Sequence, residues 1–402
     1  MREEGIVVPR ICMYTPTASG GHARYTWELM SALSRIPDCK VELVSSETLE
    51  AQFRAAPYPV HPILPALTHR REFRTKVTWA ASRLMHYPRC ERVFLDWLGK
   101  RPDVGGVHFQ EHTIWLAESL FRSVRAMGKR VFYTVHNVRP HAYPPLIPRH
   151  MVDEWDRQSW RQCDGLFVLS EQLREDLAKF LGRGHPPIYV ARHGTWSPTE
   201  GPRNAAPTLR ERLRAKRLLF FGNIRRNKGL DVLLRAAQSL PDYSLTIAGE
   251  PRELRYFEAE VVPAIERLRA AGRDVRLRNE FIPDEQLPEL FAQHSAFVLP
   301  YTTEFTAQSG VVFMALTHDL PVIASAVGGL RDLLGEFRIG LTFEANRDDQ
   351  LAAAIRELHE GGHVDDLATE IRRAKARYSW DAAAAETARA YRLAAGNAER
   401  AA

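Results

Sequence analysis

Residues 296–316, AFVLPYTTEFTAQSGVVFMAL, contain the pattern from which the fold can be inferred. The apolar run from Ala296 to Pro300 is typical of a buried strand, and the apolar residues after Gly310 have helical spacing. Between strand and helix stand a carboxylate, an amide, a hydroxyl and a glycine, at Glu304, Gln308, Ser309 and Gly310. A strand followed by a polar loop and a helix predicts one repeat of a parallel α/β sheet.

The same alternation continues on both sides of this stretch. Strand-length apolar runs occur at 10–16, 40–46, 105–110, 130–136, 165–170, 216–223, 243–249, 275–282 and 319–325. Helical patterns lie between them, for example at 113–128, 170–182 and 229–240. The alternation stops at residues 196–208, which are rich in proline and glycine and predict a linker. We therefore expect two doubly wound α/β domains, at 1–200 and 205–375, with a helical tail at 376–402 that packs back towards the first domain.

Composition narrows the class of protein. The chain has 402 residues, a formal net charge of +6 and four scattered cysteines without metal-ligand spacing. It has no apolar run long enough to span a membrane, and its N-terminus lacks the pattern of a signal peptide. These features predict a cytoplasmic protein that binds no metal through cysteine.

The positive charge is concentrated between residues 51 and 100, which contain nine Lys and Arg against three acidic residues. Within this window, residues 69–92 combine basic and apolar side chains at helical spacing, a pattern that fits an interfacial helix on an anionic membrane. The same pattern fits a helix that packs on its own domain. A nucleic-acid partner is disfavoured, because the aromatic residues here fit an amphipathic surface equally well.

Two glycine-containing loops follow predicted strands. Gly20 and Gly21 stand at the turn into a helix, where free backbone amides can bind an anion or simply make a tight turn. Gly222 is followed by Arg225 and Lys228, and cations beside a helix start can bind a diphosphate without a metal. An exposed basic loop with no ligand is the alternative.

His136 ends a third strand, where it could exchange a proton or hold a substrate hydroxyl, although a structural role is equally compatible. Glu304 with Gln308, Ser309 and Gly310 would suit a polyol that carries a phosphate. Alternatively, Ser309 could cap the helix that follows.

Taken in order, these segments resemble the retaining, nucleotide-sugar-dependent glycosyltransferases of family 4, which have the GT-B fold. The resemblance is carried by SGGHARYTWEL, YTVHNVRPH, FFGNIRRNKGLDVLL, EFTAQSGVVFMAL and PVIASAVGGL, among others, and covers nearly the whole chain. It implies two Rossmann-like domains facing a central cleft, the N-terminal one binding the acceptor and the C-terminal one the donor. It also implies a transfer that uses no metal, consistent with the absence of any Asp-x-Asp pair.

The resemblance implies a role for each candidate residue. His136 would contact the transferred sugar, and Glu304 would bind its hydroxyls. The donor diphosphate would meet Gly20 and Gly21 from one domain and Arg225 and Lys228 from the other. Ser309 and Gly310 would meet the distal phosphate at the helix start, and Gly222 and Gln308 would also belong to the donor site.

Two positions depart from the family pattern. Asn223 and Val312 stand where the family often has Arg and a second Glu, the latter holding the ribose. The sequence therefore leaves three functions open: a glycosyltransferase acting on a sugar, lipid-linked or small-molecule acceptor in glycoconjugate synthesis, an epimerase-like enzyme of the same fold, or an inactive relative that only binds.

Overall fold

A computed structural model describes residues 10–17, 20–66, 76–111, 115–140, 147–197, 207–305, 309–362 and 364–399, with backbone alone at 76–84 and 397–399. Its contacts divide the chain into two units. The first unit comprises residues 1–194 and 380–402, and the second comprises 195–379. Of the predicted features, Gln308, the start of the basic segment (69–75) and the predicted boundary at 200–205 lie outside the described residues.

The first unit is built on a seven-stranded parallel sheet with the order β3-β2-β1-β4-β5-β6-β7. Its strands are β1 (Arg10–Thr15), β2 (Val41–Ser46), β3 (Val60–Leu64), β4 (Val104–Phe109), β5 (Arg130–Thr134), β6 (Gly165–Val168) and β7 (Ile188–Val190). Its helices are α1 (Gly20–Leu33), η1 (Ala51–Ala55), α2 (Lys76–Gly99), α3 (Ala117–Ala126), α4 (Arg149–Trp160), α5 (Glu171–Leu181) and α15 (Trp380–Glu399).

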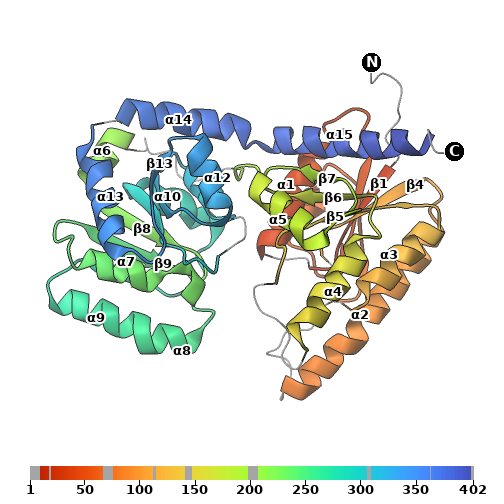
Figure 1. Ribbon diagram of the computed structural model, residues 1–402, viewed down its shortest axis with the longest axis horizontal. Helices are drawn as coiled ribbons and strands as arrows, with labels where there is room; N and C mark the ends of the chain where they lie inside the picture. The colour runs from red at the N-terminus through yellow and green to blue at the C-terminus, as the bar shows by residue number, and fades with distance from the viewer. Residues whose placement is uncertain are drawn as a thin grey trace. The chain divides into compact units, whose positions relative to one another are not determined.

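The second unit repeats this plan with six parallel strands in the order β10-β9-β8-β11-β12-β13. The strands are β8 (Arg217–Phe221), β9 (Ser244–Ala248), β10 (Val275–Arg278), β11 (Ala296–Leu299), β12 (Val322–Ser325) and β13 (Gly340–Phe343). The helices are α6 (Leu209–Arg214), η3 (Arg226–Lys228), α7 (Leu230–Ala237), α8 (Leu254–Tyr256), η4 (Phe257–Val261), α9 (Val262–Ala270), η5 (Asp284–Gln286), α10 (Leu287–Ala292), α11 (Val312–Thr317), α12 (Gly328–Glu336), α13 (Asp348–Glu360) and α14 (Val364–Arg377). Figure 1 labels many of these elements and colours the chain from red at the N-terminus to blue at the C-terminus.

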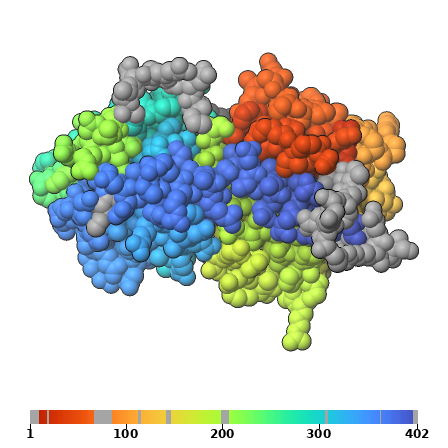
Figure 2. Space-filling view, turned by 90° about the horizontal axis from the view of Figure 1, so that it is seen from above, coloured from red at the N-terminus to blue at the C-terminus, as the bar shows by residue number. Residues whose placement is uncertain are grey.

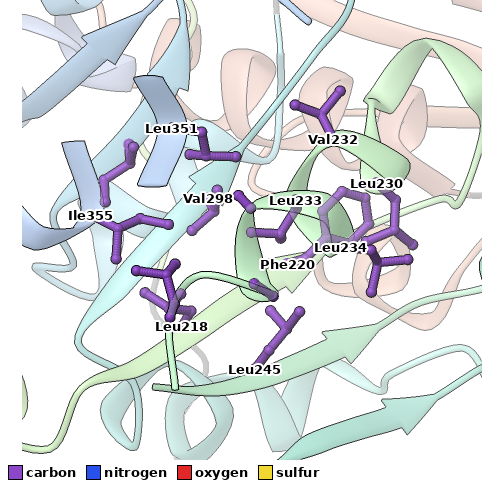
Figure 3. Close-up of a cluster of buried hydrophobic side chains, with 14 of the residues drawn as sticks. Leu218, Phe220, Leu230, Val232, Leu233, Leu234, Leu245, Val298, Leu351 and Ile355 are labelled. Carbon is purple, nitrogen blue, oxygen red and sulfur yellow. The ribbon is translucent and has the colours of Figure 1, made fainter. Parts of the chain in front are cut away.

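The central strands are buried along their length because helices cover both faces of each sheet. In β11, Val298 joins the core cluster beneath α7 and α13, whereas Phe297 packs on Phe291 of α10 with ring centroids 5.6 Å apart. Figure 3 shows the first of these faces, where leucine, valine and isoleucine side chains from β8, β9, β11, α7 and α13 meet. Successive side chains of a strand point to opposite faces, and both faces are covered here. Every position is therefore buried, which explains why these strands are apolar runs in the sequence.

The C-terminal helix α15 belongs to the first unit, although it follows the second unit in sequence. It packs on α1, β6 and β7, and in the space-filling view its blue surface lies against the red and orange N-terminal elements (Figure 2). Arg35, just after α1, is paired with Asp381 at 2.5 Å. The chain thus passes from the first unit to the second at Gly194 and returns at Trp380.

The predicted fold class, two doubly wound α/β domains, is confirmed. Three short strands were not predicted, namely β3, β7 and β13. β3 contains Pro62, and β7 has only three residues, so neither forms an apolar run. None of the helices within the described ranges is long and apolar enough to cross a membrane.

Candidate active site

The candidate residues of the second unit gather where its strand order reverses. The chain leaves β8 towards β9 on one side and leaves β11 towards β12 on the other, so the loops after β8 and β11 are neighbours at the carboxyl edge of the sheet. In doubly wound sheets, ligands bind at this switch point. The loop after β8 carries Gly222, Arg225 and Lys228, and the loop after β11 carries Glu304.

These two loops are fastened to each other through backbone atoms. The amide of Thr302 donates to the carbonyl of Asn227 at 3.1 Å. Gly229 has a φ of +62°, and a Cβ at this position would lie 1.8 Å from the carbonyl oxygen of Pro300. Only glycine combines this backbone angle with so close an approach. Gly229, at the first position of the helix predicted at 229–240, therefore sets the distance between the two loops.

The three cations of the loop after β8 have different surroundings. Arg226 pairs with Glu260 and lies over the ring of Tyr256, with 4.7 Å between guanidinium carbon and ring centroid. Arg225 and Lys228 form no ion pair with any residue that the structure describes. Two unpaired cations at a sheet switch point are a charge arrangement that an anion would stabilise.

Lys228 lies on an aromatic surface. Its Nζ is 3.7 Å from the centroid of the Tyr301 ring and 4.1 Å from that of Phe305, both in the loop after β11. Burial, with a smaller contribution from the nearby charge of Arg225, lowers the pKa of Lys228 to about 7. A lysine whose pKa lies near neutrality can gain or lose its charge in response to a ligand.

Ser309 is almost fully buried and hydrogen-bonds Tyr301, with 2.9 Å between the hydroxyl oxygens. It does not cap α11, which begins at Val312 without any side-chain cap, so the alternative reading of Ser309 as an N-cap is wrong. The carbonyl of Gly310 accepts a hydrogen bond from the indole of Trp196 at 3.0 Å. The hydroxyl of Ser309 is thus already engaged within the protein rather than presented at the helix start.

Glu304 is exposed in the same loop and forms no ion pair with a described residue. Gly222 has a φ of +120° and faces the side chain of Val311, whose Cγ1 would lie 3.5 Å from an added Cβ. The structure therefore brings Gly222, Arg225, Lys228 and Glu304 to one edge of one sheet.

In the first unit, a comparable switch point lies between β1 and β4. Gly20 and Gly21 begin α1 there, and Gly20 has a φ of +79°. The amide of Gly20 donates to a carboxylate oxygen of Glu50 at 2.9 Å. In this structure a carboxylate of the protein itself occupies the start of α1, the position where the sequence leaves open either a bound anion or a simple tight turn.

His136 lies just after β5, beside this switch point. Its Nε2 is 3.3 Å from the side-chain oxygen of Gln110, and its ring is edge-on to that of His22, with centroids 4.5 Å apart. Burial, reinforced by the neighbouring histidines, holds the pKa of His136 well below its ordinary value. The imidazole is therefore neutral at pH 7 and available as a hydrogen-bond partner rather than as a cation.

Sequence reasoning missed the residues around His136. Glu111 follows β4 and binds the hydroxyl of Thr17 from the loop after β1, and its other carboxylate oxygen is 3.7 Å from Nδ1 of His22. The sequence did contain a sign of this site, because Gln110 and Glu111 are polar residues at the end of an apolar run and directly after it. Within the described ranges, no group of three or more His, Cys, Asp or Glu side chains is arranged to hold a metal ion.

Comparison with known families explains this arrangement. The model "Glycosyltransferase Family 4" matches residues 19–195, and the model "Glycosyl transferases group 1" matches residues 215–361. The chain is a glycosyltransferase, and each of its two units is matched by one of these two family models. The first match includes Gly20 and His136 of the first unit, and the second includes Gly222, Lys228 and Glu304 of the second unit.

Curated relatives of this glycosyltransferase are themselves glycosyltransferases. Alpha-maltose-1-phosphate synthase of Mycolicibacterium smegmatis is 26% identical over 283 residues, which cover 64% of this chain and 72% of the relative. D-inositol 3-phosphate glycosyltransferase of Corynebacterium glutamicum is 28% identical over 348 residues, covering 82% of this chain and 79% of the relative. The named products and acceptors of these relatives differ from each other.

Solved structures show the same GT-B fold. Sucrose-phosphate synthase from Thermosynechococcus elongatus has a TM-score of 0.73 at 19% identity, covering 96% of this chain and 98% of that chain. Anabaena HepE in complex with UDP and glucose has a TM-score of 0.69 at 13% identity, covering 95% and 98%. At these identities the likeness concerns the fold alone.

The two departures from the family pattern have different structural settings. Asn223 accepts a hydrogen bond at 3.1 Å from Arg252, whose guanidinium also pairs with Glu250 at 2.8 Å. Val312 is fully buried in the first turn of α11. The side chain of Val312 cannot accept a hydrogen bond, so this position cannot play the part that the second Glu has in the family pattern.

Proposed function

We propose that this glycosyltransferase moves a sugar from a nucleotide diphosphate sugar to an acceptor hydroxyl and retains the configuration at the anomeric carbon. The observation that carries the proposal is the pair of uncompensated cations, Arg225 and Lys228, at the switch point of the second unit. A diphosphate supplies the charge that this site lacks, and the structures of HepE with UDP and with UDP-glucose support a donor of that class.

Each candidate residue has a part in this proposal. Arg225 and Lys228 neutralise the diphosphate as its bond to the sugar breaks, which is where developing charge needs stabilisation. Glu304 accepts hydrogen bonds from hydroxyls of the donor sugar. His136, neutral and held by Gln110, is the candidate contact of the first unit with the transferred sugar. The backbone at Gly20, Gly21, Gly222 and Gly310 allows close approach to phosphate.

The direct test has two steps. A thermal-shift screen of UDP-, GDP-, ADP- and TDP-sugars identifies the donor, since a ligand that binds only the folded protein stabilises it by mass action. Transfer from that donor to a panel of sugar, inositol phosphate and lipid-linked acceptors is then followed by NMR, which reads the anomeric configuration of the product. An inverted product would contradict the retention that we propose.

A second candidate function is donor binding without transfer, and the burial of Val312 is the observation that favours it. Slow hydrolysis of the donor in water separates the two functions, because a protein that only binds would leave the nucleotide sugar intact. Release of nucleoside diphosphate that depends on Glu304 would identify the enzyme.

A further inference from the structure

We propose that Tyr301, held by Ser309, is a positioning residue that seats the ammonium group of Lys228 for binding the donor diphosphate. The inference rests on the proposed function and deepens it, because it concerns how the site presents its charge. Neither Tyr301 nor a structural role for the Ser309 hydroxyl is implied by the family resemblance, which assigns Ser309 to the phosphate.

The rings of Tyr301 and Phe305, here called the seat, fix the position of Nζ of Lys228. Nζ of Lys228 lies 3.7 Å from the Tyr301 centroid and 4.1 Å from the Phe305 centroid, so two rings of one loop support the cation. Aromatic faces attract ammonium groups, most strongly where water is excluded. A lysine side chain otherwise has four freely rotating bonds, and a fixed seat removes the entropy cost of aligning it when the ligand binds.

The Tyr301 ring is itself immobilised. Tyr301 is 1% exposed, its hydroxyl bonds that of Ser309 at 2.9 Å, and its carbonyl accepts a hydrogen bond from Ser325 at 2.6 Å. Phe305 lies against the same ring, with centroids 4.5 Å apart. Because burial raises the pKa of Tyr301, its hydroxyl stays protonated at all physiological pH values and can serve as a steady hydrogen-bond partner.

Because of the groups around Lys228, a bound anion should change the protonation of its amino group. The charge of Arg225 acts on it from its own loop, and among the described residues of the loop after β11 its recorded contacts are the neutral rings of Tyr301 and Phe305. Burial and Arg225 lower the pKa of Lys228 to about 7, even though the rings favour its charged form. A bound diphosphate favours the ammonium form, so we expect binding above pH 7 to be accompanied by uptake of a proton.

The second unit contains a matched control. Arg226 lies over the ring of Tyr256, a buried tyrosine of the same unit, with a 4.7 Å separation, but Arg226 is already paired with Glu260. Tyr256 also bonds the side chain of Asp231 at 3.2 Å. Removing either tyrosine ring costs comparable burial, whereas only Tyr301 supports an unpaired cation.

The experiment is isothermal titration calorimetry of the full chain with UDP, ADP and GDP at pH 8, in two buffers of different ionisation enthalpy. At this pH a terminal phosphate with a pKa of about 6 is fully ionised, so it releases no proton. The wild type should take up close to one proton per bound nucleotide, and Lys228→Met should abolish that uptake.

Tyr301→Leu should weaken nucleotide binding about threefold to thirtyfold and reduce the uptake, because greater access of water to Lys228 would raise its pKa towards its ordinary value. Tyr301→Phe, which keeps the ring, should recover most of the affinity. Ser309→Ala should lie between the wild type and Tyr301→Leu, and Tyr256→Leu should match the wild type in affinity and proton uptake even if its melting temperature falls.

Two results would overturn the inference, and they are distinguishable. If the wild type binds a nucleotide and Tyr301→Leu binds it equally well with the same proton uptake, the seat has no role and the proposed function stands. If the wild type binds none of the three nucleotides at millimolar concentration, both the proposed donor site and the proposed role of Tyr301 are refuted.

Discussion

His108 and Tyr391 are 283 positions apart in the sequence, and their side chains are hydrogen-bonded at 2.6 Å. The other ring nitrogen of His108 bonds the hydroxyl of Thr134 at 2.7 Å. His108 lies on β4 and Tyr391 on α15, so this bond joins the C-terminal helix to the sheet of the first unit. Burial without a compensating charge lowers the pKa of His108 to about 3.

The first unit should therefore lose stability in mild acid. A histidine with an ordinary pKa near 6.5 in the unfolded chain and about 3 in the folded protein binds a proton only on unfolding in that range. The free energy of unfolding should fall by about 1.4 kcal/mol per pH unit below 6.5 for this residue alone. His193, whose pKa burial lowers to about 4, should add to the slope.

Urea unfolding between pH 7.5 and 5 measures this slope. His108→Gln should reduce it, whereas Tyr391→Phe, which removes one hydrogen bond but keeps the histidine, should lower stability by about 1 kcal/mol with the slope unchanged. An acid slope that is the same in His108→Gln as in the wild type would show that His108 is not the titrating group.

Lys228→Ala and Glu304→Ala should each lower kcat/KM severely while leaving the fold intact. Losing a charge-assisted contact to a reacting group should cost about 2–4 kcal/mol of transition-state stabilisation. Arg226→Ala is the control, because this neighbouring cation is already paired with Glu260 and should affect transfer little. Near wild-type turnover in both site variants, with circular dichroism unchanged, would refute the assignment of these residues.

Gly229→Ala should lower the stability of the protein more than the same substitution at a glycine with a similar φ. Gly272 has a φ of +77° with no atom within 4 Å of an added Cβ, so alanine there should cost about 1–2 kcal/mol of backbone strain alone. At Gly229 a similar angle is combined with a clash against Pro300, so the loop after β11 must move. Thermal unfolding of both variants, with nucleotide titrations, should show the larger loss for Gly229→Ala; equal losses would mean that the two loops are not held at contact distance.

Transfer should proceed without a divalent metal. The loop after β8 supplies Arg225 and Lys228 for the diphosphate, and the chain has no Asp-x-Asp pair to hold a metal on it. Activity assayed with excess chelator should equal that with added Mg²⁺ or Mn²⁺. Activity that vanishes with the chelator and returns only with metal would require another account of the diphosphate site.

The basic segment at residues 69–92 should bind anionic vesicles at low salt, with about 1 kcal/mol of attraction for each basic residue near the surface. Sedimentation with anionic and neutral liposomes tests this, and high salt should release the protein. A variant with Arg70, Arg71 and Arg74 changed to Gln is the comparison. If the wild type stays in the supernatant with anionic vesicles at low salt, a soluble acceptor becomes the better hypothesis.

The sequence by itself determined the architecture and most of the loops that matter. A strand that is covered on both faces, such as β11, is buried at every position and is therefore an apolar run in the sequence. The polar residues that follow such a run mark the carboxyl edge of the sheet. Glu304 and Lys228 were identifiable in this way as residues of loops at that edge. The sequence predicted a C-terminal helix that packs back towards the first domain, but it could not show that Tyr391 bonds His108, because a contact across 283 positions has no local pattern.

Only the tertiary structure decided what each polar side chain does. Three cations in one loop look equivalent in sequence, but Glu260 from a distant helix neutralises Arg226 and leaves Lys228 on the ring of Tyr301. Ser309 looks like a helix cap until its hydroxyl is seen bonded to Tyr301. Charge and hydrogen-bond state depend on which atoms lie within a few ångströms, and folding brings those atoms from separate loops.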